Sequence, residues 1–307
     1  MSMSKLLDNY AFIVSISLIL GLATGGSPAY QSEITILALA IMMTLSLSEV
    51  DLASGLLRRI AGKATTALLL NYALLTGLIL TISIFFDGDI RSGWILMAAV
   101  PSAIAVVPFS YMLKADTRLA LVGTTAIYFL ALLFAPAITV LALSQGIDTF
   151  RLIFTIIVLI IIPILLSRIP TLRIIEGRKK TPMINLCFGV LIFVMTGANN
   201  SAFAEEPSLV FWVSVASFLR TFVVGLAIFA FFRLRDTPSD TTKVYVLFSS
   251  YKNLGLTAAL AMTLISYEAA IPATICIPFE LVWLIFLKRF SESEYDVSDR
   301  DNRPEKN

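Results

Sequence analysis

Long apolar segments, separated by short polar connectors, recur along the whole chain. An α-helix needs about 20 predominantly apolar residues to cross a bilayer. The connectors, such as 25–28 and 87–91, are polar or contain glycine and proline. The pattern therefore predicts ten transmembrane helices, covering residues 7–24, 33–50, 64–86, 93–113, 118–144, 150–169, 183–203, 208–232, 242–266 and 269–288.

The composition supports an all-α membrane protein. Of the 307 residues, 58% are hydrophobic and 14% are charged, and the mean hydropathy is +0.87. A soluble domain is typically about 45–50% apolar and about 25% charged. Most of this chain must therefore be solvated by lipid, and nucleic acid is not an expected partner.

The basic residues fall almost entirely on one side of the predicted membrane. Nineteen of the 23 Lys and Arg residues lie in the two termini and the even-numbered connections. Only Arg91 and Arg151 lie on the other side, and Arg220 and Lys252 lie within spans. Cationic loops stay in the cytoplasm. We therefore expect a multi-pass protein of the cell membrane with both termini cytoplasmic, the apolar run after Lys5 being a retained first helix rather than a cleaved signal peptide.

Ten helices divide into two halves of five. The polar segment 144–148 marks the midpoint, giving a first repeat of residues 1–145 and a second of residues 146–290. Because five is odd, the two halves would insert with opposite topology, as in alternating-access carriers. Residues 291–307 are polar, charged and without periodicity, and they predict a disordered cytoplasmic tail.

The fourth helix of each half looks interrupted. In the first, Pro101, Ser102 and Pro108 fall near the middle of the span, and in the second the segment 249–255 places polar groups and Gly255 there. Backbone freed from helical bonding must face protein or a water-filled cavity, and paired broken helices indicate a transporter's binding site. The alternative is a pair of kinks that serve packing alone.

Three ionisable residues are predicted within spans: Arg220, Lys252 and Glu280. Buried charges are costly and should find partners, so Glu280 should pair with Lys252 or Arg220 and leave one cation in excess. A positive cavity favours an anionic substrate; the alternative is a structural ion pair plus a snorkelling arginine. Asn71 could line the same cavity or bind a neighbouring helix backbone.

The chain offers little for enzymatic or metal chemistry. It has no histidine and two cysteines, Cys187 and Cys276, both in apolar runs without CxxC spacing. Neither a zinc site nor a disulfide framework is indicated, and buried, inert thiols are expected. We therefore expect no enzyme, no metal and no cofactor; a channel or a sensor is a further alternative.

Several segments resemble the bile acid:sodium symporter family. The segment 251–260 is similar to that family's Gln-Asn-x-Gly-Leu-Ala crossing segment, and 101–113 with 115–121 resembles its Pro-Gly-Gly-Thr-Ala-Ser-Asn segment and fifth helix. Residues 45–52 and 271–273 resemble the end of its second helix and the start of its tenth. The resemblance spans nearly the whole chain.

The resemblance implies a two-part fold. Helices 1, 2, 6 and 7 would form a panel domain, and helices 3–5 and 8–10 a core domain in which helices 4 and 9 unwind and cross. The substrate would lie between the two domains, with sodium behind the crossing. Candidate substrate-binding residues are Ile104, Ala105, Asn253, Glu280 and Arg220.

The departures from the family bear on sodium. Val106 and Val107 stand at its sodium-binding Ser-Asn pair, and Phe248 stands at its sodium-binding Glu. Lys252 and Asn71 stand at two glutamines of the second sodium site. Apolar groups and a fixed ammonium would disfavour sodium, so we expect Lys252 to supply the charge that sodium supplies elsewhere.

These observations predict a sodium-independent secondary transporter of small organic anions, working by alternating access as a monomer or weak homo-oligomer. Lys252, Glu280 and Asn71 are the candidate coupling residues; Glu280 stands at a His of helix ten in the resemblance, and a Lys–Glu pair could switch with protonation. The alternative is a conventional sodium-coupled organic anion or bile acid symporter with rearranged ligands.

Overall fold

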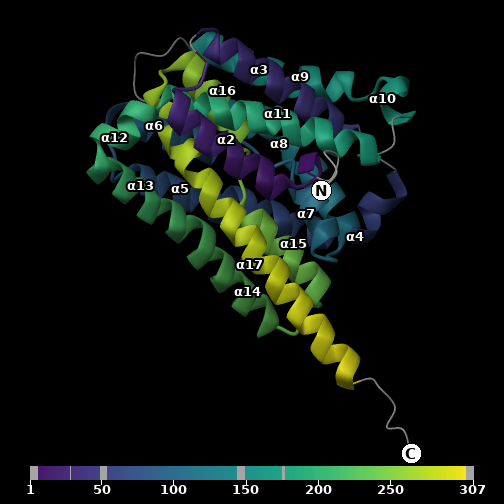
Figure 1. Cartoon of the computed structure of the whole chain (residues 1–307). Helices are drawn as coiled ribbons and strands as arrows, with labels where there is room; N and C mark the ends of the chain where they lie inside the picture. Colours follow the sequence, from purple (N-terminus) through teal and green to yellow (C-terminus); the bar gives the residue numbers. More distant parts are fainter. Residues whose placement is uncertain (1–5, 28, 49–53, 144–148, 175–176, 302–307) are drawn as a thin grey trace, which may run out of the picture.

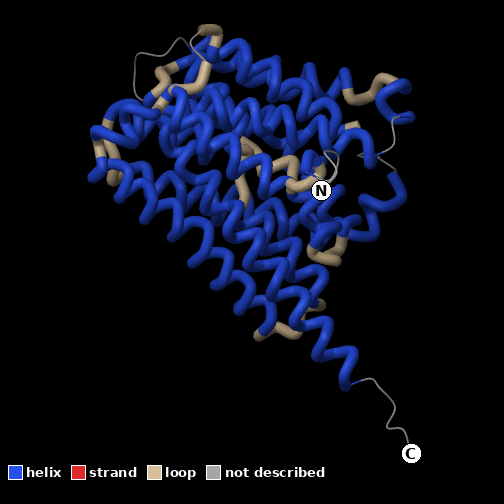
Figure 2. Tube along the Cα trace, in the orientation of Figure 1, coloured by secondary structure: helices blue, strands red, loops and turns tan. Residues whose placement is uncertain are grey.

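The protein is helical throughout the part that the computed structural model describes, which is residues 6–27, 29–48, 54–143, 149–174 and 177–301. Figure 2 shows helices joined by short connections and no strand in these segments. The proposed midpoint break at 144–148 and residues 49–52 of the resemblance lie outside the described residues.

The first half runs from α2 to α8. Its helices are α2 (Tyr10–Thr24), α3 (Gln31–Leu47), α4 (Ser54–Leu68), the π-helical η1 (Leu69–Leu75), α5 (Thr76–Ser83), α6 (Gly88–Ala99), α7 (Val106–Met112) and α8 (Thr117–Ala142). The α4, η1 and α5 segments follow one another without a break, because η1 only widens the hydrogen-bond spacing locally.

The second half runs from α9 to α17. Its helices are α9 (Thr149–Leu166), α10 (Pro170–Ile174), α11 (Gly177–Ala198), α12 (Asn200–Glu205), α13 (Pro207–Phe218), the π-helical η2 (Leu219–Val223), α14 (Val224–Arg233), α15 (Ser239–Ser250), α16 (Leu254–Leu264), the 3₁₀ turn η3 (Glu268–Ala270) and α17 (Ile271–Asp301).

Five stretches of the described chain are helical, apolar and long enough to cross a membrane: Ala61–Ser83, Thr117–Ala142, Lys180–Ala198, Pro207–Arg233 and Glu268–Phe290. The helices α2 and α3 and the segment Ile153–Leu166 are apolar but shorter. The two remaining predicted spans are each divided into two short helices by a non-helical segment. The chain is thus an all-helical protein with several helices suited to a membrane.

Two sets of helices pack among themselves. In Figure 1, α2, α3, α9 and α11 lie near one another, and α11 packs on both α2 and α3. The chain approaches α11 closely at Gly197, where an added Cβ would stand 2.1 Å from the backbone nitrogen of Gly26. In the other set, α4 and α6 pack on α8, α13 packs on α17, and α14 packs on α15.

The two interruptions are shorter than the motifs suggested. The first covers residues 100–105 and includes Pro101 and Ser102, whereas Pro108 lies in the first turn of α7, where a missing N–H disturbs nothing. The second covers Tyr251–Asn253, and Gly255 already belongs to α16. The expectation that Pro108 and Gly255 form part of the unwound backbone is therefore wrong.

The expected irregular tail is also wrong over most of its length. The helix α17 continues past Ser291 to Asp301, and Figure 1 shows it projecting beyond the other helices. A helix that is already formed gains one hydrogen bond for each residue it adds. A polar sequence therefore prolongs it without needing an apolar face; residues 302–307 lie outside the described part.

Candidate functional site

The two interruptions meet in the interior of the protein. The backbone N–H of Asn253 donates to the carbonyl oxygen of Pro101 over 2.9 Å. The backbone is extended at Val100 (ψ 157°) and at Tyr251 (ψ 126°), where the preceding half-helices end. One interruption thus satisfies a polar backbone group of the other, which lipid cannot do.

Lys252 fills the point where the interruptions meet. The residue is fully buried. Four oxygens lie within hydrogen-bonding distance of its Nζ and share its three N–H groups: Thr76 Oγ1 at 2.9 Å, Val100 O at 2.9 Å, Ala98 O at 3.1 Å and Asn71 Oδ1 at 3.2 Å. The ring centroid of Tyr72 lies 5.1 Å from Nζ, within the range of a cation–π contact. The ammonium is therefore enclosed by oxygen atoms, as a bound metal cation would be.

The π-helical segment η1 supplies part of this oxygen cage. Asn71 lies within η1 and Thr76 directly follows it. The Nδ2 of Asn71 donates to the carbonyl oxygen of Phe248 over 3.1 Å, and Thr76 Oγ1 lies 2.7 Å from Ala98 O. Of the two interpretations of Asn71, contact with a neighbouring backbone is correct, and its side chain also accepts from Lys252.

The second π-helical segment, η2, carries Arg220, which is fully buried. Arg220 Nη2 forms an ion pair with Glu280 Oε1, and its Nε donates to Cys276 Sγ over 3.3 Å. Its Nη1 donates to the carbonyl oxygen of Ser250 over 3.4 Å. Arg220 thus ties η2 both to α17 and to the end of α15.

The hypothesis of a Lys252–Glu280 ion pair is wrong. The carboxylate of Glu280 accepts from the backbone N–H of Lys252 over 3.4 Å, while the Lys252 ammonium is bonded to oxygens of η1, α5 and α6. A guanidinium can hold a carboxylate and further acceptors at once, and this leaves the ammonium for the other side of the break. In the charge cluster of Arg220, Lys252 and Glu280, one cation therefore remains without a carboxylate partner, as expected.

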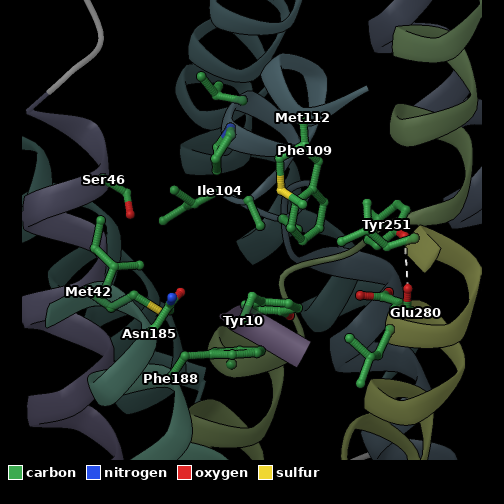
Figure 3. Close-up of a pocket in the computed structure, with 18 of the residues that line it drawn as sticks. Tyr10, Met42, Ser46, Ile104, Phe109, Met112, Asn185, Phe188, Tyr251 and Glu280 are labelled. Carbon is green, nitrogen blue, oxygen red and sulfur yellow. Dashed lines mark hydrogen bonds between the residues drawn. The ribbon is translucent and has the colours of Figure 1, made fainter. Parts of the chain in front are cut away.

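A cavity of about 480 Å³ lies beside the interruptions. Figure 3 shows Met42, Asn185 and Phe188 on one side of it, with Tyr251 and Glu280 facing them. Its walls come from both sets of helices, including α2, α3 and α11 of the first set and α7, α16 and α17 of the second. This size is ordinary for a small-molecule site.

Aromatic rings form a continuous row across this cavity. Tyr10 stacks on Phe188 at 5.4 Å and meets the edge of Phe109 at 5.5 Å, and Phe109 meets Tyr251 at 5.5 Å. Tyr251 is anchored, because its hydroxyl donates to the backbone carbonyl of Glu280 over 2.9 Å (Figure 3). The row offers flat apolar surfaces to a ligand.

The structure brings most expected site residues to this cavity. The residues on its wall are Ile104, Ala105, Pro108, Lys252, Asn253, Gly255 and Glu280. Arg220 lies behind the wall rather than on it, so its expected contact with substrate is replaced by contact with Glu280. Pro101, Ser102 and Asn71 are buried or enclosed behind the wall as well.

Asn253 lies on the cavity wall and also caps the N-terminus of α16. Its Oδ1 accepts from the N–H of Leu256 over 3.0 Å and so caps α16, and its Nδ2 donates to the Tyr128 hydroxyl over 2.8 Å. An N-cap side chain of this kind replaces a bond that the first helical turn lacks. Gly255 lies in that first turn, where backbone N–H groups have no acceptor within the helix, and it lines the cavity.

Sequence reasoning missed the aromatic row and Thr124. Thr124 Oγ1 is buried, has no hydrogen-bond partner and lies on the cavity wall, whereas Thr125 Oγ1 bonds the carbonyl of Leu121 at 2.9 Å. Thr125 therefore bonds its own helix, whereas Thr124 does not. Nothing in the sequence distinguishes the two neighbours.

Three of the positions that depart from the resembled sodium-binding residues, Val106, Val107 and Phe248, hold apolar side chains. Val106 and Phe248 are fully buried. The Phe248 ring lies so close to Gly123 that an added Cβ there would stand 2.8 Å from it. Val107 lies on the cavity wall. In the part of the chain that the structure describes, no three His, Cys, Asp or Glu side chains gather where they could hold a metal ion.

The protein was compared with known proteins. No protein-family model matches the chain, and no curated protein matches it.

Proposed function

We propose that this protein is a secondary transporter of small organic anions that works by alternating access without sodium, and that it is a divergent relative of the bile acid:sodium symporters. The observation that carries the proposal is the oxygen cage around Lys252. Two broken helices meet there, beside a cavity, and a fixed cation holds them together. Broken helices at corresponding positions are typical of transporter binding sites.

Corresponding features of the two halves support an inverted repeat. In each half, a π-helical segment precedes the broken helix: η1 precedes the α6–α7 break, and η2 precedes the α15–α16 break. Each π-helical segment also aims a polar side chain at the breaks, Asn71 from η1 and Arg220 from η2. We therefore propose ten spans in two opposed halves, with broken spans four and nine.

The two sets of helices correspond to the parts that would move. The set of α2, α3, α9 and α11 forms the proposed panel, and the set that carries both breaks forms the proposed core. The cavity lies between them and is lined by Asp8, Met112, Thr181 and Lys288, which lie at or near those ends of the predicted spans that adjoin the basic connections. On the proposed topology this is the cytoplasmic side, so the cavity would be inward-facing.

An anion is the substrate that the charges favour. Arg220 and Lys252 contribute two positive charges and Glu280 one negative charge, which leaves one positive charge in the cluster. The helix α16 also begins at the cavity, and the positive end of its dipole attracts anions. The aromatic row would contact the apolar part of the substrate.

Sodium independence follows from the occupied cage. A sodium ion would need several oxygen ligands, and the Lys252 ammonium already takes four. A second cation at the same oxygens would meet strong repulsion in a poorly solvated site. The alternative, a sodium symporter with displaced ligands, predicts instead that sodium stabilises the protein.

The first experiment is a thermal melt of the purified protein with benzoate, pyruvate, pantoate and taurocholate, each in sodium chloride and in choline chloride. We expect at least one anion to raise Tm equally in both salts, and the same anion to enter proteoliposomes without a sodium gradient. An increase in Tm by sodium alone, or by anions only when sodium is present, would support the sodium symporter instead.

A further inference from the structure

Glu280 has an unusual position within the buried charge cluster. Arg220 is enclosed behind the cavity wall and the Lys252 ammonium faces η1 and α6, but Glu280 lies on the wall and is 8% exposed. Of the three charged residues in the cluster, Glu280 alone keeps exposed surface, because Arg220 and Lys252 are 0% exposed. A proton could therefore reach Glu280 from the cavity without any change in the two cations.

We propose that Glu280 is the coupling-proton site: it takes up one proton from the cavity when an organic anion binds, so that anion and proton cross the membrane together. The inference rests on the proposed transport function and adds its coupling ion. The bond formed is one O–H on the carboxylate; the proton comes from cavity water and returns to water when the anion leaves.

The coupling follows from the shared cavity. A bound anion and the Glu280 carboxylate are like charges within one cavity of about 480 Å³. Their repulsion is relieved when Glu280 is protonated, because a nearby like charge disfavours ionisation. Linkage is reciprocal: if the anion promotes protonation of Glu280, protonation strengthens binding of the anion by the same factor.

The charge balance also favours joint binding. With Glu280 ionised the cluster carries one net positive charge, and protonation alone would raise it to two. Protonation together with a monoanion restores the original value. Binding a proton together with a monoanion therefore costs less electrostatic free energy than binding the proton alone or the monoanion alone.

Several other titratable groups lie near the carboxylate of Glu280. They are Tyr10 of α2, Tyr251 and Lys252 of the break, Arg220 of η2, and Cys276 one turn earlier on α17. Farther along the cavity wall lie Asp8 and Lys288, which carry opposite charges. Among these groups, Glu280 alone combines a carboxylate with direct contact to both Arg220 and the break.

Protonation would act on a contact inside the proposed core, between α17, η2 and the α15–α16 break. The Glu280 carboxylate bonds Arg220 on η2 and the N–H of Lys252 in the break. A neutral carboxyl accepts these bonds more weakly than a carboxylate does. The link between the break and η2 is therefore loosened when the anion is present, which is when the transporter must change conformation.

The test combines infrared spectroscopy with binding, on the full chain and on Glu280→Gln, which keeps an acceptor for Arg220. In ligand-free wild type, acid titration should produce a protonated-carboxyl band that Glu280→Gln lacks. Benzoate, added at constant pH, should strengthen this band and remove about one proton per bound benzoate from a weakly buffered solution. Its affinity should rise about tenfold for each unit by which the pH falls, and stay constant in Glu280→Gln.

Glu268→Gln is the matched control, because Glu268 is exposed and is the first residue of the same span; it should behave as wild type. Benzoate affinity that is independent of pH in wild type would overturn the coupling while leaving anion transport intact. An identical band in wild type and Glu280→Gln would overturn the proton site. If the band belongs to Glu280 but none of benzoate, pyruvate, pantoate and taurocholate binds, the coupling falls together with the proposed function.

Discussion

The backbone N–H of Asn253 donates to the carbonyl oxygen of Pro101 over 2.9 Å, although 152 positions separate the two residues in the chain. This bond joins the two interrupted spans directly. The neighbouring residue, Lys252, reinforces the junction through bonds to Ala98 and Val100 on the other span. The break in one span is thus held in place by the break in the other, which makes Lys252 the first residue to test.

Lys252→Ala should destabilise the protein and make its stability depend on sodium. The substitution takes the Lys252 donor away from the buried Asn71 Oδ1 and Val100 O, whereas Ala98 O keeps its bond from Thr76 Oγ1. Unsatisfied buried groups cost about 1–3 kcal/mol each, so we expect a clear fall in Tm. Sodium should partly restore Tm in the variant and not change it in wild type, whereas choline should restore nothing.

Lys288→Ala is the control for this test, because Lys288 is an exposed cation on the same cavity and has no part in the oxygen cage. It should not acquire a response to sodium. If sodium does not change the Tm of Lys252→Ala, the oxygen cage requires an ammonium specifically, and the comparison with a sodium site is wrong.

Arg220 and Glu280 should show strong energetic coupling. Arg220→Met leaves Glu280 as a buried charge without its ion-pair partner, and breaking a buried pair costs about 3–5 kcal/mol. The double variant Arg220→Met with Glu280→Leu removes both charges. It should therefore melt at a higher temperature than Arg220→Met alone, in a double-variant cycle measured by Tm. Additive losses would contradict a direct pair.

Thr76 and Thr124 form a matched pair of buried hydroxyls. Thr76→Val loses a bond to Ala98 O and a ligand of the Lys252 ammonium, and should cost about 1–3 kcal/mol. Thr124→Val removes a hydroxyl without a partner and should be neutral or stabilise the ligand-free protein. Because Thr124 lies on the cavity wall, the same variant should weaken anion binding. A loss of stability in Thr124→Val would show that its hydroxyl has a partner in solution.

Gly197→Ala should destabilise the proposed panel. The added methyl group would stand 2.1 Å from Gly26 N and 2.2 Å from Gly26 Cα, and backbone atoms cannot rotate out of the way. Overpacking of this kind typically costs about 1–3 kcal/mol or more. Gly77→Ala is the control, because no atom lies within 4 Å of its added methyl, and it should not lower Tm. Equal Tm values would contradict the close approach of α11 to the Gly26 turn.

The sequence by itself determined that the chain is helical and suited to a membrane, and where its two spans break. Apolar length and the positions of Pro101 and Lys252 carry this information, because backbone polar groups in lipid must be bonded within a helix or enclosed by protein. It also identified Lys252 and Glu280 as candidate functional residues, since a charged residue within an apolar span costs free energy and usually has a functional role.

Only the tertiary structure decided which charges pair. Arg220, Lys252 and Glu280 come from three different segments, namely η2, the α15–α16 break and α17, and sequence spacing does not specify how side chains on separate segments are directed. The guanidinium bonds Glu280, and the ammonium finds oxygens of Asn71, Thr76, Ala98 and Val100. The aromatic row was also decided by the tertiary structure alone. Its four residues lie in separate segments of the chain, and packing brings them to one cavity: Tyr10, Phe109, Phe188 and Tyr251.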